Sequence, residues 1–325
     1  MKKLKIGVLG LANIAQKAII PAIMKCNRFD LYGIASRNIA NKNKIEEEYL
    51  VAFYEDYQKM VDDPMIDALY IPLPNSLHFP WVKKALQKGK DLLVEKSLAC
   101  SLKDVTYLND LAEQNNLALV ENFQFRKHKQ LKIIKEIIND NKVGEIRTIR
   151  SSFGFPPFPD KDNIRYKKDL GGGALLDAGA YPIKIAQEIL GRDLNITSAL
   201  LAFGDSEVDI WGSGMLQKQQ SSQHVQFSFG FDNHYQCSLE IWGSKGKLFT
   251  NRIFTAPPDY EPAIQIETGE GLETIKLESD NQYVNMLEHF YDCVHDFELK
   301  TNEYKANVNQ SRLLEGFYNL AYQSD

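Results

Sequence analysis

The sequence predicts two domains: an α/β domain built on a parallel sheet, then an α+β domain built on a large, mainly antiparallel open sheet. Three observations lead to this prediction. The 325 residues, 44% of them hydrophobic, exceed what one hydrophobic core usually serves. Strand-like and helix-like patterns alternate as far as Asn122, and beyond it strand-like runs dominate. We therefore expect domains at residues 1–122 and 123–325.

The elements of the first domain follow one another as strand, helix, strand. Strands are expected at 4–9, 31–36, 68–72, 91–94 and 117–122, and helices at 14–26, 42–49, 77–88 and 102–114. Such alternation implies βαβ units and a parallel sheet. The short apolar runs "ALYI" and "LLV" fit strands that are buried on both faces.

The second domain is predicted to be rich in strands. Helices are expected at 131–139, after the triple glycine 171–173, and at 284–297 and 306–322. Strand-like runs cover 146–155, 196–203, 210–216, 225–231, 235–242, 247–254 and 264–278. Turn residues between several of these runs favour antiparallel pairing. Alternating apolar and polar residues at 225–231 indicate a sheet with one covered face.

Composition limits the possible partners. The net charge of −5 argues against nonspecific binding to nucleic acid or to anionic membranes, which need a basic surface. The apolar run at 6–11 is too short for a signal or membrane segment, so we expect a cytoplasmic protein. The four cysteines are widely spaced and His289 and His295 do not share a helical face, so we predict no metal site.

A glycine turn after the first strand suggests a dinucleotide site. The expected G-x-G-x-x-G reads Gly10-Leu11-Ala12-Asn13-Ile14-Ala15, with alanine at the second and third glycine positions. Alanine is the smallest departure, and a helix beginning at Asn13 still points N–H groups at a phosphate. We assign Gly10, Ala12, Asn13 and Ile14 to the cofactor, although many such turns bind no nucleotide.

The end of the second strand bears on which dinucleotide binds. An acidic residue there would bind the ribose hydroxyls of NAD, but the sequence has Ser36 and Arg37 instead. Arg37 can form a charge-assisted contact with a 2′-phosphate, which favours NADP(H). The alternative is a solvated arginine in a surface turn.

Several segments together resemble the glucose-fructose oxidoreductase, inositol dehydrogenase and rhizopine-catabolism family (Gfo/Idh/MocA). They are "GLANIA", "ASR", "IPLPNSLHFPWVKKALQKGKDLLVEKSLA", "ENFQFRKH" and "GGGALLDAGAYPIK". The resemblance implies a Rossmann domain, a C-terminal α+β domain whose sheet often forms a subunit interface, and hydride transfer between a nicotinamide and a sugar or polyol. We therefore expect a homodimer or homotetramer.

Two further segments, "SSFGFPPFPDKDNIRYKKDLGGGALLDAGAYPIK" and "GSKGKLFTNRIFTAPPDYEP", are similar to one subgroup of this family. That subgroup is the NADPH-dependent ketoreductases of nucleotide-linked keto-deoxysugars, particularly the C-3 ketoreductases of dTDP-sugars. The resemblance implies a nucleotide-sugar substrate.

Reducing a ketone needs a hydride donor and a proton source. Lys96 follows the predicted strand 91–94, at the edge where parallel sheets bind ligands, and its ammonium can stabilise a developing alkoxide. The family usually has Glu-Lys-Pro here, whereas this chain has Glu95-Lys96-Ser97. We assign Glu95 and Lys96 to the cofactor site and Lys96 also to substrate and catalysis.

Asp177 and Tyr181 are the second group of candidate catalytic residues. A spacing of four residues places them on one face of the helix after the triple glycine. We predict Tyr181 as the general acid, with Lys96 assisting, and Asp177 as a ligand of a substrate hydroxyl. The alternative is a packed helix face with Tyr181 as a core phenol, but a buried Asp177 would then need partners.

The remaining assignments are less specific. Pro72, Leu73, Asn75 and His78, after the "ALYI" strand, are expected near the nicotinamide ribose, with His78 in a supporting role. Arg126 either orients cofactor or substrate or pairs with a carboxylate. For the nucleotide of the substrate we select Arg165, Tyr166 and Arg252, which are otherwise surface residues of strands.

Three functions therefore compete. The first is an NADPH-dependent ketoreductase of nucleotide sugars. The second is an NADP(H)-dependent dehydrogenase of a free sugar, polyol or trans-dihydrodiol, for which the aromatic and basic "PPFPDKDNIRY" would have little use. The third is a nicotinamide-binding regulator without catalysis, which would have no need of Lys96, Asp177 and Tyr181 together.

Overall fold

The computed structural model describes residues 2–322. Internal contacts group the chain into two units, which we describe separately. The first unit comprises 1–122 and 283–308, and the second comprises 123–282 and 309–325. The sequence analysis expected all of 123–325 in the second domain, whereas this grouping places 283–308 in the first unit. These residues group with the first unit because Met286, Leu287 and Phe290 pack into the core of its sheet.

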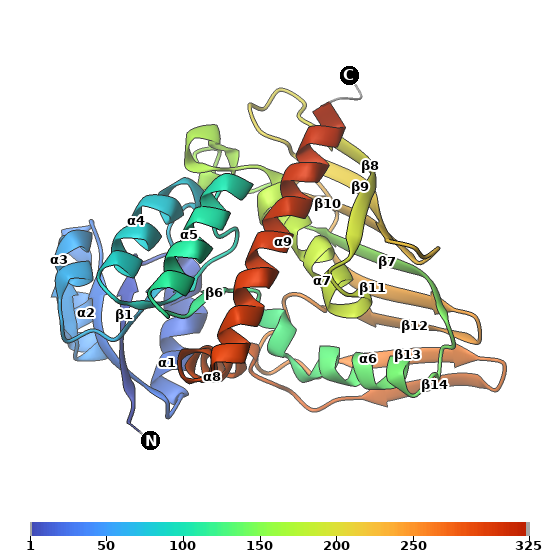
Figure 1. Ribbon diagram of the computed structural model, residues 1–325, viewed down its shortest axis with the longest axis horizontal. Helices are drawn as coiled ribbons and strands as arrows, with labels where there is room; N and C mark the ends of the chain where they lie inside the picture. The colour runs from blue at the N-terminus through green and yellow to red at the C-terminus, as the bar shows by residue number, and fades with distance from the viewer. Residues whose placement is uncertain (1, 323–325) are drawn as a thin grey trace. The chain divides into compact units, whose positions relative to one another are not determined.

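The first unit contains a six-stranded sheet with the strand order β3-β2-β1-β4-β5-β6 (Figure 1). The sheet is parallel, as the sequence predicted. Its strands are β1 (Leu4–Leu9), β2 (Phe29–Ala35), β3 (Ala52–Tyr54), β4 (Ala68–Ile71), β5 (Asp91–Val94) and β6 (Leu119–Glu121). Its helices are α1 (Ile20–Lys25), α2 (Lys42–Tyr49), α3 (Tyr57–Asp62), α4 (Asn75–Gln87) and α5 (Leu102–Gln114). The sequence patterns did not predict β3 and α3, which are only three and six residues long.

Local signals explain where these helices begin. Ser101 precedes α5, and its hydroxyl accepts a hydrogen bond from the N–H of Asp104 at 3.1 Å.

The predicted helix 14–26 begins at Asn13 and contains a π-helical turn, Ala15–Ile19, before α1. Such turns are rare and concentrate at functional sites.

From β1 the chain adds β2 and β3 on one side and then β4, β5 and β6 on the other side, so the direction of strand addition reverses between β1 and β4. β1 pairs in parallel with both β2 and β4. In open α/β sheets this point, at the carboxyl ends of the strands, is where ligands bind. The segments after β1, β2, β4 and β5 carry all the predicted cofactor residues except Arg126, which belongs to the second unit. The fold therefore brings them to one edge of the first unit.

The second unit contains an eight-stranded sheet with the order β14-β13-β12-β11-β7-β10-β9-β8. The strands are β7 (Ile146–Gly154), β8 (Leu194–Ala202), β9 (Trp211–Lys218), β10 (His224–Gly230), β11 (Gln236–Gly243), β12 (Gly246–Asn251), β13 (Ala263–Thr268) and β14 (Gly271–Lys276). All described pairs are antiparallel except β10 with β7, which confirms the predicted sheet type. The predicted single run 264–278 is two strands, because Gly269-Glu270-Gly271 turns the chain.

Helices cover one face of this sheet (Figure 1). Two of them are α6 (Lys129–Asn139) and α7 (Ala180–Leu190), and α6 buries Leu131, Ile134 and Ile137 at helical spacing. The opposite face exposes large apolar side chains, with Leu200 48%, Trp211 44% and Trp242 51% exposed. The sheet therefore has one covered and one open face.

Two helices end the described chain. They are α8 (Gln282–His295) and α9 (Phe297–Tyr322), so the last helix is longer than the predicted 306–322. Within residues 2–322, no helix combines the length and the apolar composition that a membrane span requires.

Candidate functional site

The turn after β1 has the geometry of a dinucleotide loop. Gly10 has φ +121°, and a Cβ there would lie 2.8 Å from Leu73 Cδ2, so only glycine fits. Ala15 is fully buried, as expected where the third glycine lets helix and strand pack. Ala12, Asn13 and Ile14 keep exposed surface at the start of the helix. These residues fit the pyrophosphate of a dinucleotide, because the helix N-terminus presents N–H groups there.

The end of β2 fits a 2′-phosphate. Ser36 is buried, its N–H bonds Tyr54 O at 3.1 Å, and its Oγ accepts a hydrogen bond from Asn38 N. Arg37 is exposed, and among residues 2–322 no carboxylate pairs with it. Its charge is therefore available to an anionic ligand.

The turn that carries Lys96 is held by side chains of the first unit. Asn75 Oδ1 accepts from Ser97 N at 3.2 Å, and Glu121 Oε1 accepts from Leu98 N at 2.9 Å. The Lys96–Ser97 peptide bond is cis. The hydrogen bonds from Ser97 N and Leu98 N fix the backbone that presents Lys96, although serine stands where the resemblance implies proline.

His78 supports the same turn. Its Nδ1 donates to Ser97 O at 2.7 Å, and its ring has no exposed surface. Burial lowers the pKa of His78 to about 4, so the ring is neutral at physiological pH. The predicted direct contact of His78 with the cofactor does not fit this burial, because the ring faces the Lys96 turn instead.

Glu95 lies at the centre of a small polar network. Its Oε1 accepts from Tyr70 Oη at 2.7 Å and from Asn122 Nδ2 at 2.6 Å. Burial raises the pKa of the Glu95 carboxyl, although both hydrogen bonds favour its ionised form. Because Tyr70 and Asn122 already bind the Glu95 carboxylate, a role in fixing the end of the strand fits Glu95 better than direct binding of the cofactor.

The second unit brings together two of the predicted substrate residues. Arg165 Nε pairs with Asp177 Oδ2 at 2.6 Å, and the guanidinium also lies 4.8 Å from the ring centre of Phe158. Asp177 therefore has the partner that a largely buried carboxylate needs. The predicted helix is present, but Asp177 lies inside a π-helical turn, Leu175–Gly179, whereas Tyr181 lies in the first turn of α7.

Tyr181 is packed by aromatic rings of its own unit. The rings of Phe123, Phe125, Phe153 and Phe254 lie 5.0 to 5.9 Å from it, and 6% of its surface is exposed. Such packing fixes the ring plane and therefore the direction of the hydroxyl. The environment suits both a core phenol and a precisely oriented acid, so the catalytic role stays a prediction.

The other predicted nucleotide contacts lie in two aromatic groups. Tyr166 Oη accepts from Phe158 N at 3.1 Å, and its ring packs against Phe158 and Phe231. Arg252, at φ +50°, lies between Tyr235 and Tyr260 at 5.2 and 5.7 Å. No carboxylate within residues 2–322 forms an ion pair with Arg252, which leaves its charge for an anion.

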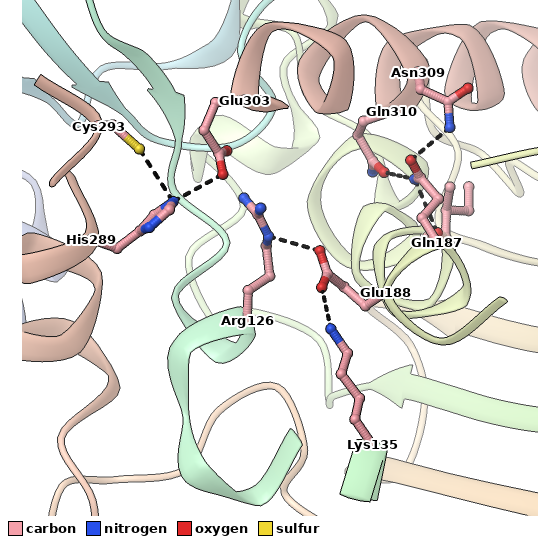
Figure 2. A network of polar contacts seen from close by, with 10 residues as sticks. Arg126, Lys135, Gln187, Glu188, His289, Cys293, Glu303, Asn309 and Gln310 are labelled. Atoms are coloured by element: carbon pink, nitrogen blue, oxygen red, sulfur yellow. Dashed lines mark hydrogen bonds and ion pairs between the residues drawn. The ribbon is translucent and has the colours of Figure 1, made fainter. Parts of the chain in front are cut away.

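Arg126 takes the second of its two predicted roles. Its Nε pairs with Glu188 Oε1 at 2.9 Å, and Lys135 Nζ binds Glu188 Oε2 at 2.7 Å (Figure 2). The Arg126 side chain is 8% exposed and that of Glu188 19%. Burial alone would raise the pKa of Glu188, but Arg126 and Lys135 outweigh it and lower that pKa to about 2. The carboxylate pair, one of the two roles predicted for Arg126, is therefore present, and its role toward cofactor or substrate stays a prediction.

One buried group combines metal-ligand types in the first unit. His289 Nε2 lies 2.9 Å from Glu303 Oε1 and 3.4 Å from Cys293 Sγ (Figure 2). The predicted absence of a metal site overlooked this group, because it joins α8 to α9 over fourteen residues of sequence. Its separations are hydrogen-bond distances, and we treat it as a link between the two helices.

Sequence reasoning missed the supporting residues. The Lys96 turn and the strand before it are held by Tyr70, Glu121 and Asn122. These residues lie in or beside strands, where the sequence alone does not distinguish them from other buried positions. Their one signal is a polar side chain at the end of a buried parallel strand. Tyr235 and Tyr260 carried no signal, because only the fold brings them to Arg252.

Comparisons with known proteins agree with this geometry. A family model described as "Oxidoreductase family, NAD-binding Rossmann fold" matches residues 4–123, and one described as "GFO/IDH/MocA C-terminal domain" matches residues 131–249. A protein of Saccharopolyspora spinosa named dTDP-3,4-didehydro-2,6-dideoxy-alpha-D-glucose 3-reductase is 35% identical over 86% of this chain and 84% of its own length. The D-xylose 1-dehydrogenase (NADP(+)) 2 of Haloferax volcanii is 28% identical over 97% of this chain and 96% of its own.

Solved structures give the same result. The crystal structure of KijD10, a 3-ketoreductase from Actinomadura kijaniata in complex with NADP and TDP-benzene, matches with a TM-score of 0.93 and 33% identity over 98% of both chains. Structures of KijD10 with a lysine replaced by alanine or glutamate, and with a tyrosine replaced by phenylalanine, match as well. The two family models and the extent of these matches lead to one conclusion: the chain belongs to the Gfo/Idh/MocA family of nicotinamide-dependent oxidoreductases.

Proposed function

We propose that this protein is an NADPH-dependent ketoreductase that reduces a keto group of a dTDP-linked keto-deoxysugar. The observation that carries the proposal is the 35% identity, over most of both chains, to a dTDP-keto-deoxysugar 3-reductase. Three further relatives with that name are 32–34% identical. The more distant xylose dehydrogenase keeps oxidation of a free sugar as the alternative to be tested.

The cofactor is NADP(H). Gly10 and the helix N-terminus at Asn13 would hold its pyrophosphate, and Arg37 its 2′-phosphate. Bound NADPH supplies the hydride. The uncommitted charge of Arg37 supports the preference for NADPH over NADH, because a guanidinium pairs bidentately with a phosphate but gains little from a ribose hydroxyl.

The chain's own residues would manage the proton and the charge. Lys96 stabilises the alkoxide that develops on the substrate oxygen, and Tyr181 donates the proton to that oxygen. Asp177, held by Arg165, binds a sugar hydroxyl with its remaining lone pairs. The variants of KijD10 replace the same two residue types, one lysine and one tyrosine.

The nucleotide of the substrate would be held by residues of the second unit. Arg252, between two tyrosine rings and without an acidic partner in the described part of the chain, suits a diphosphate. Tyr166 lies in an aromatic group that offers a stacking surface for thymine.

We also propose a homodimer or homotetramer in the cytoplasm. The open face of the eight-stranded sheet exposes Trp211 and Trp242, and exposed tryptophans on one face mark an association surface. Light scattering after size-exclusion chromatography measures the oligomer directly. Replacing Trp242 with arginine should shift the mass toward the monomer if this face pairs.

The deciding experiment follows NADPH absorbance at 340 nm. The purified enzyme is given dTDP-3,4-didehydro-2,6-dideoxy-α-D-glucose in one assay and D-xylose with NADP⁺ in another. Oxidation of NADPH by the keto-sugar, with no reduction of NADP⁺ by xylose, supports the proposal. The reverse pattern makes the enzyme a free-sugar dehydrogenase, and binding of NADPH without turnover of either leaves the regulator.

A further inference from the structure

The triple glycine before Asp177 marks a tightly built helix start. Gly173 has φ +115°, and its N–H bonds Arg165 O at 2.9 Å. A Cβ at Gly173 would lie 2.4 Å from Asp209 Oδ1. Glycine is therefore needed because another part of the chain presses against this position.

That other part is Asp209, in the segment between β8 and β9. Its Oδ2 accepts from Leu175 N at 2.5 Å, and its own backbone oxygen accepts from Ala174 N at 2.8 Å. Asp209 is 6% exposed. One residue, 34 positions away from Leu175, therefore satisfies the first two amides of the helical segment that carries Asp177 and Tyr181.

The start of this segment matters because its geometry is unusual. Asp177 N bonds Gly173 O at 3.2 Å, and the π-helical turn Leu175–Gly179 follows at once. A π turn holds its residues at a different angular spacing from an α-helix, so the directions of Asp177 and Tyr181 depend on where the turn is fixed. Asp209 binds the amides of Ala174 and Leu175, where this helical segment begins.

We propose that Asp209 is a positioning residue, which sets the register of the π-helical turn and thereby aims Asp177 and Tyr181 at the substrate. The proposal rests on the function proposed above, because it assigns those two side chains to substrate. Asp209 itself touches neither substrate nor cofactor and acts through the backbone.

The polar surroundings of Asp209 are consistent with this role. Its hydrogen-bond donors are backbone N–H groups, and burial raises its pKa to about 6. Burial and Tyr322 raise the pKa of Tyr318 of α9, and the negative charge of Asp209 adds to that rise. A carboxylate that is buried and charged at neutral pH is costly unless its hydrogen bond from Leu175 N is needed.

The test compares two changes at Asp209 with one nearby. Asp209→Ala removes the side-chain acceptor, whereas Asp209→Asn keeps an oxygen at that point and removes only the charge. Asp205→Ala is the matched control, because Asp205 lies in the same segment and is exposed. Gly173→Ala is a second route to the same defect, since its Cβ displaces the carboxylate.

We expect Asp209→Ala and Gly173→Ala to lower kcat for the keto-sugar about 10²-fold, the usual result of misplacing a reacting group by about 1 Å. Asp209→Asn should recover most of that loss. The Kd of NADPH, measured by calorimetry, should change less than about twofold, because the residues assigned to the pyrophosphate and the 2′-phosphate lie in the first unit. A folded Asp209→Ala enzyme with the kcat of Asp205→Ala overturns the proposal, and so does an Asp209→Asn variant no better than Asp209→Ala.

A second readout does not depend on activity. Hydrogen exchange of the amide of Leu175, which bonds the Asp209 carboxylate, should quicken in Asp209→Ala and stay slow in Asp209→Asn. If the wild type fails to reduce the keto-sugar while this pattern holds, the proposed function has failed and the positioning geometry has not. Equal exchange in all variants overturns the positioning role itself.

Discussion

The ion-pair network at Glu188 allows a quantitative prediction for Glu188→Gln. Arg126 and Lys135 lower the pKa of Glu188 from 4.5 to about 2 against the effect of burial. A difference of about 2.5 pKa units is worth about 3 kcal/mol of folding free energy at pH 7. Breaking a buried ion pair from one side costs a similar 3–5 kcal/mol, because it leaves Arg126 without this carboxylate. We therefore expect Glu188→Gln to destabilise the second unit by about 3 kcal/mol.

The pH dependence follows from the sign of the shift. Because the pKa is lower in the folded protein, the stabilisation is complete above pH 4.5 and is lost as the pH falls toward 2. Urea denaturation followed by circular dichroism at pH 7 and pH 3.5 measures both values. The matched control is Glu136→Gln, since Glu136 is 52% exposed and lies 4.0 Å from Lys132, and it should cost less than about 0.5 kcal/mol. Equal losses for the two variants, or a loss for Glu188→Gln that does not shrink at pH 3.5, would refute this account.

Three other predictions concern the cofactor, the proton donor and the pH profile. Arg37→Ala should weaken NADPH binding about tenfold and leave NADH binding unchanged, because it removes one charge-assisted phosphate contact, and calorimetry with both cofactors checks this. Tyr181→Phe should lower kcat 10²-fold or more with the Kd of NADPH unchanged, as loss of a general acid requires, and steady-state kinetics beside calorimetry decide it. The pKa of Asp209 is raised from 3.8 to about 6, so its contribution to stability, about 3 kcal/mol, is present in acid and is lost as the pH rises through 6. Asp209→Asn should flatten that part of the stability profile, and denaturation at pH 4 and pH 7 shows whether it does.

Much of the fold could be predicted because local patterns agree with it. The parallel strands of the first unit are short and apolar throughout, and the strand Asp91–Val94 has the predicted limits. The loop at Gly10 was recognisable because its backbone conformation requires glycine. The missed elements β3 and α3 are too short for periodicity to stand out.

The parts of the site that could not be predicted depend on contacts distant in sequence. Arg165 and Asp177 were chosen for separate reasons, and only the fold showed that they pair. The carboxylate that pairs with Arg126 is Glu188, 62 residues away, and the sequence offered no means of finding it. His78 was given a supporting role at the cofactor from its place after the "ALYI" strand, and the sequence does not show its burial against Ser97. When a side chain binds a backbone atom, its partner can be any residue type, so the sequence offers no complementary residue from which the contact could be predicted.

The grouping of 283–308 with the first unit has a consequence for biosynthesis. Residues 1–122 leave the ribosome first, but the core of that unit also needs Met286, Leu287 and Phe290, which are made after nearly all of the second unit. The nascent Rossmann sheet therefore waits for more than 160 residues of translation before its hydrophobic surface is complete. A clone ending at Asn122 should accordingly yield aggregates, whereas a fusion of 1–122 to 283–308 through a short linker should give a protein that can be isolated in solution.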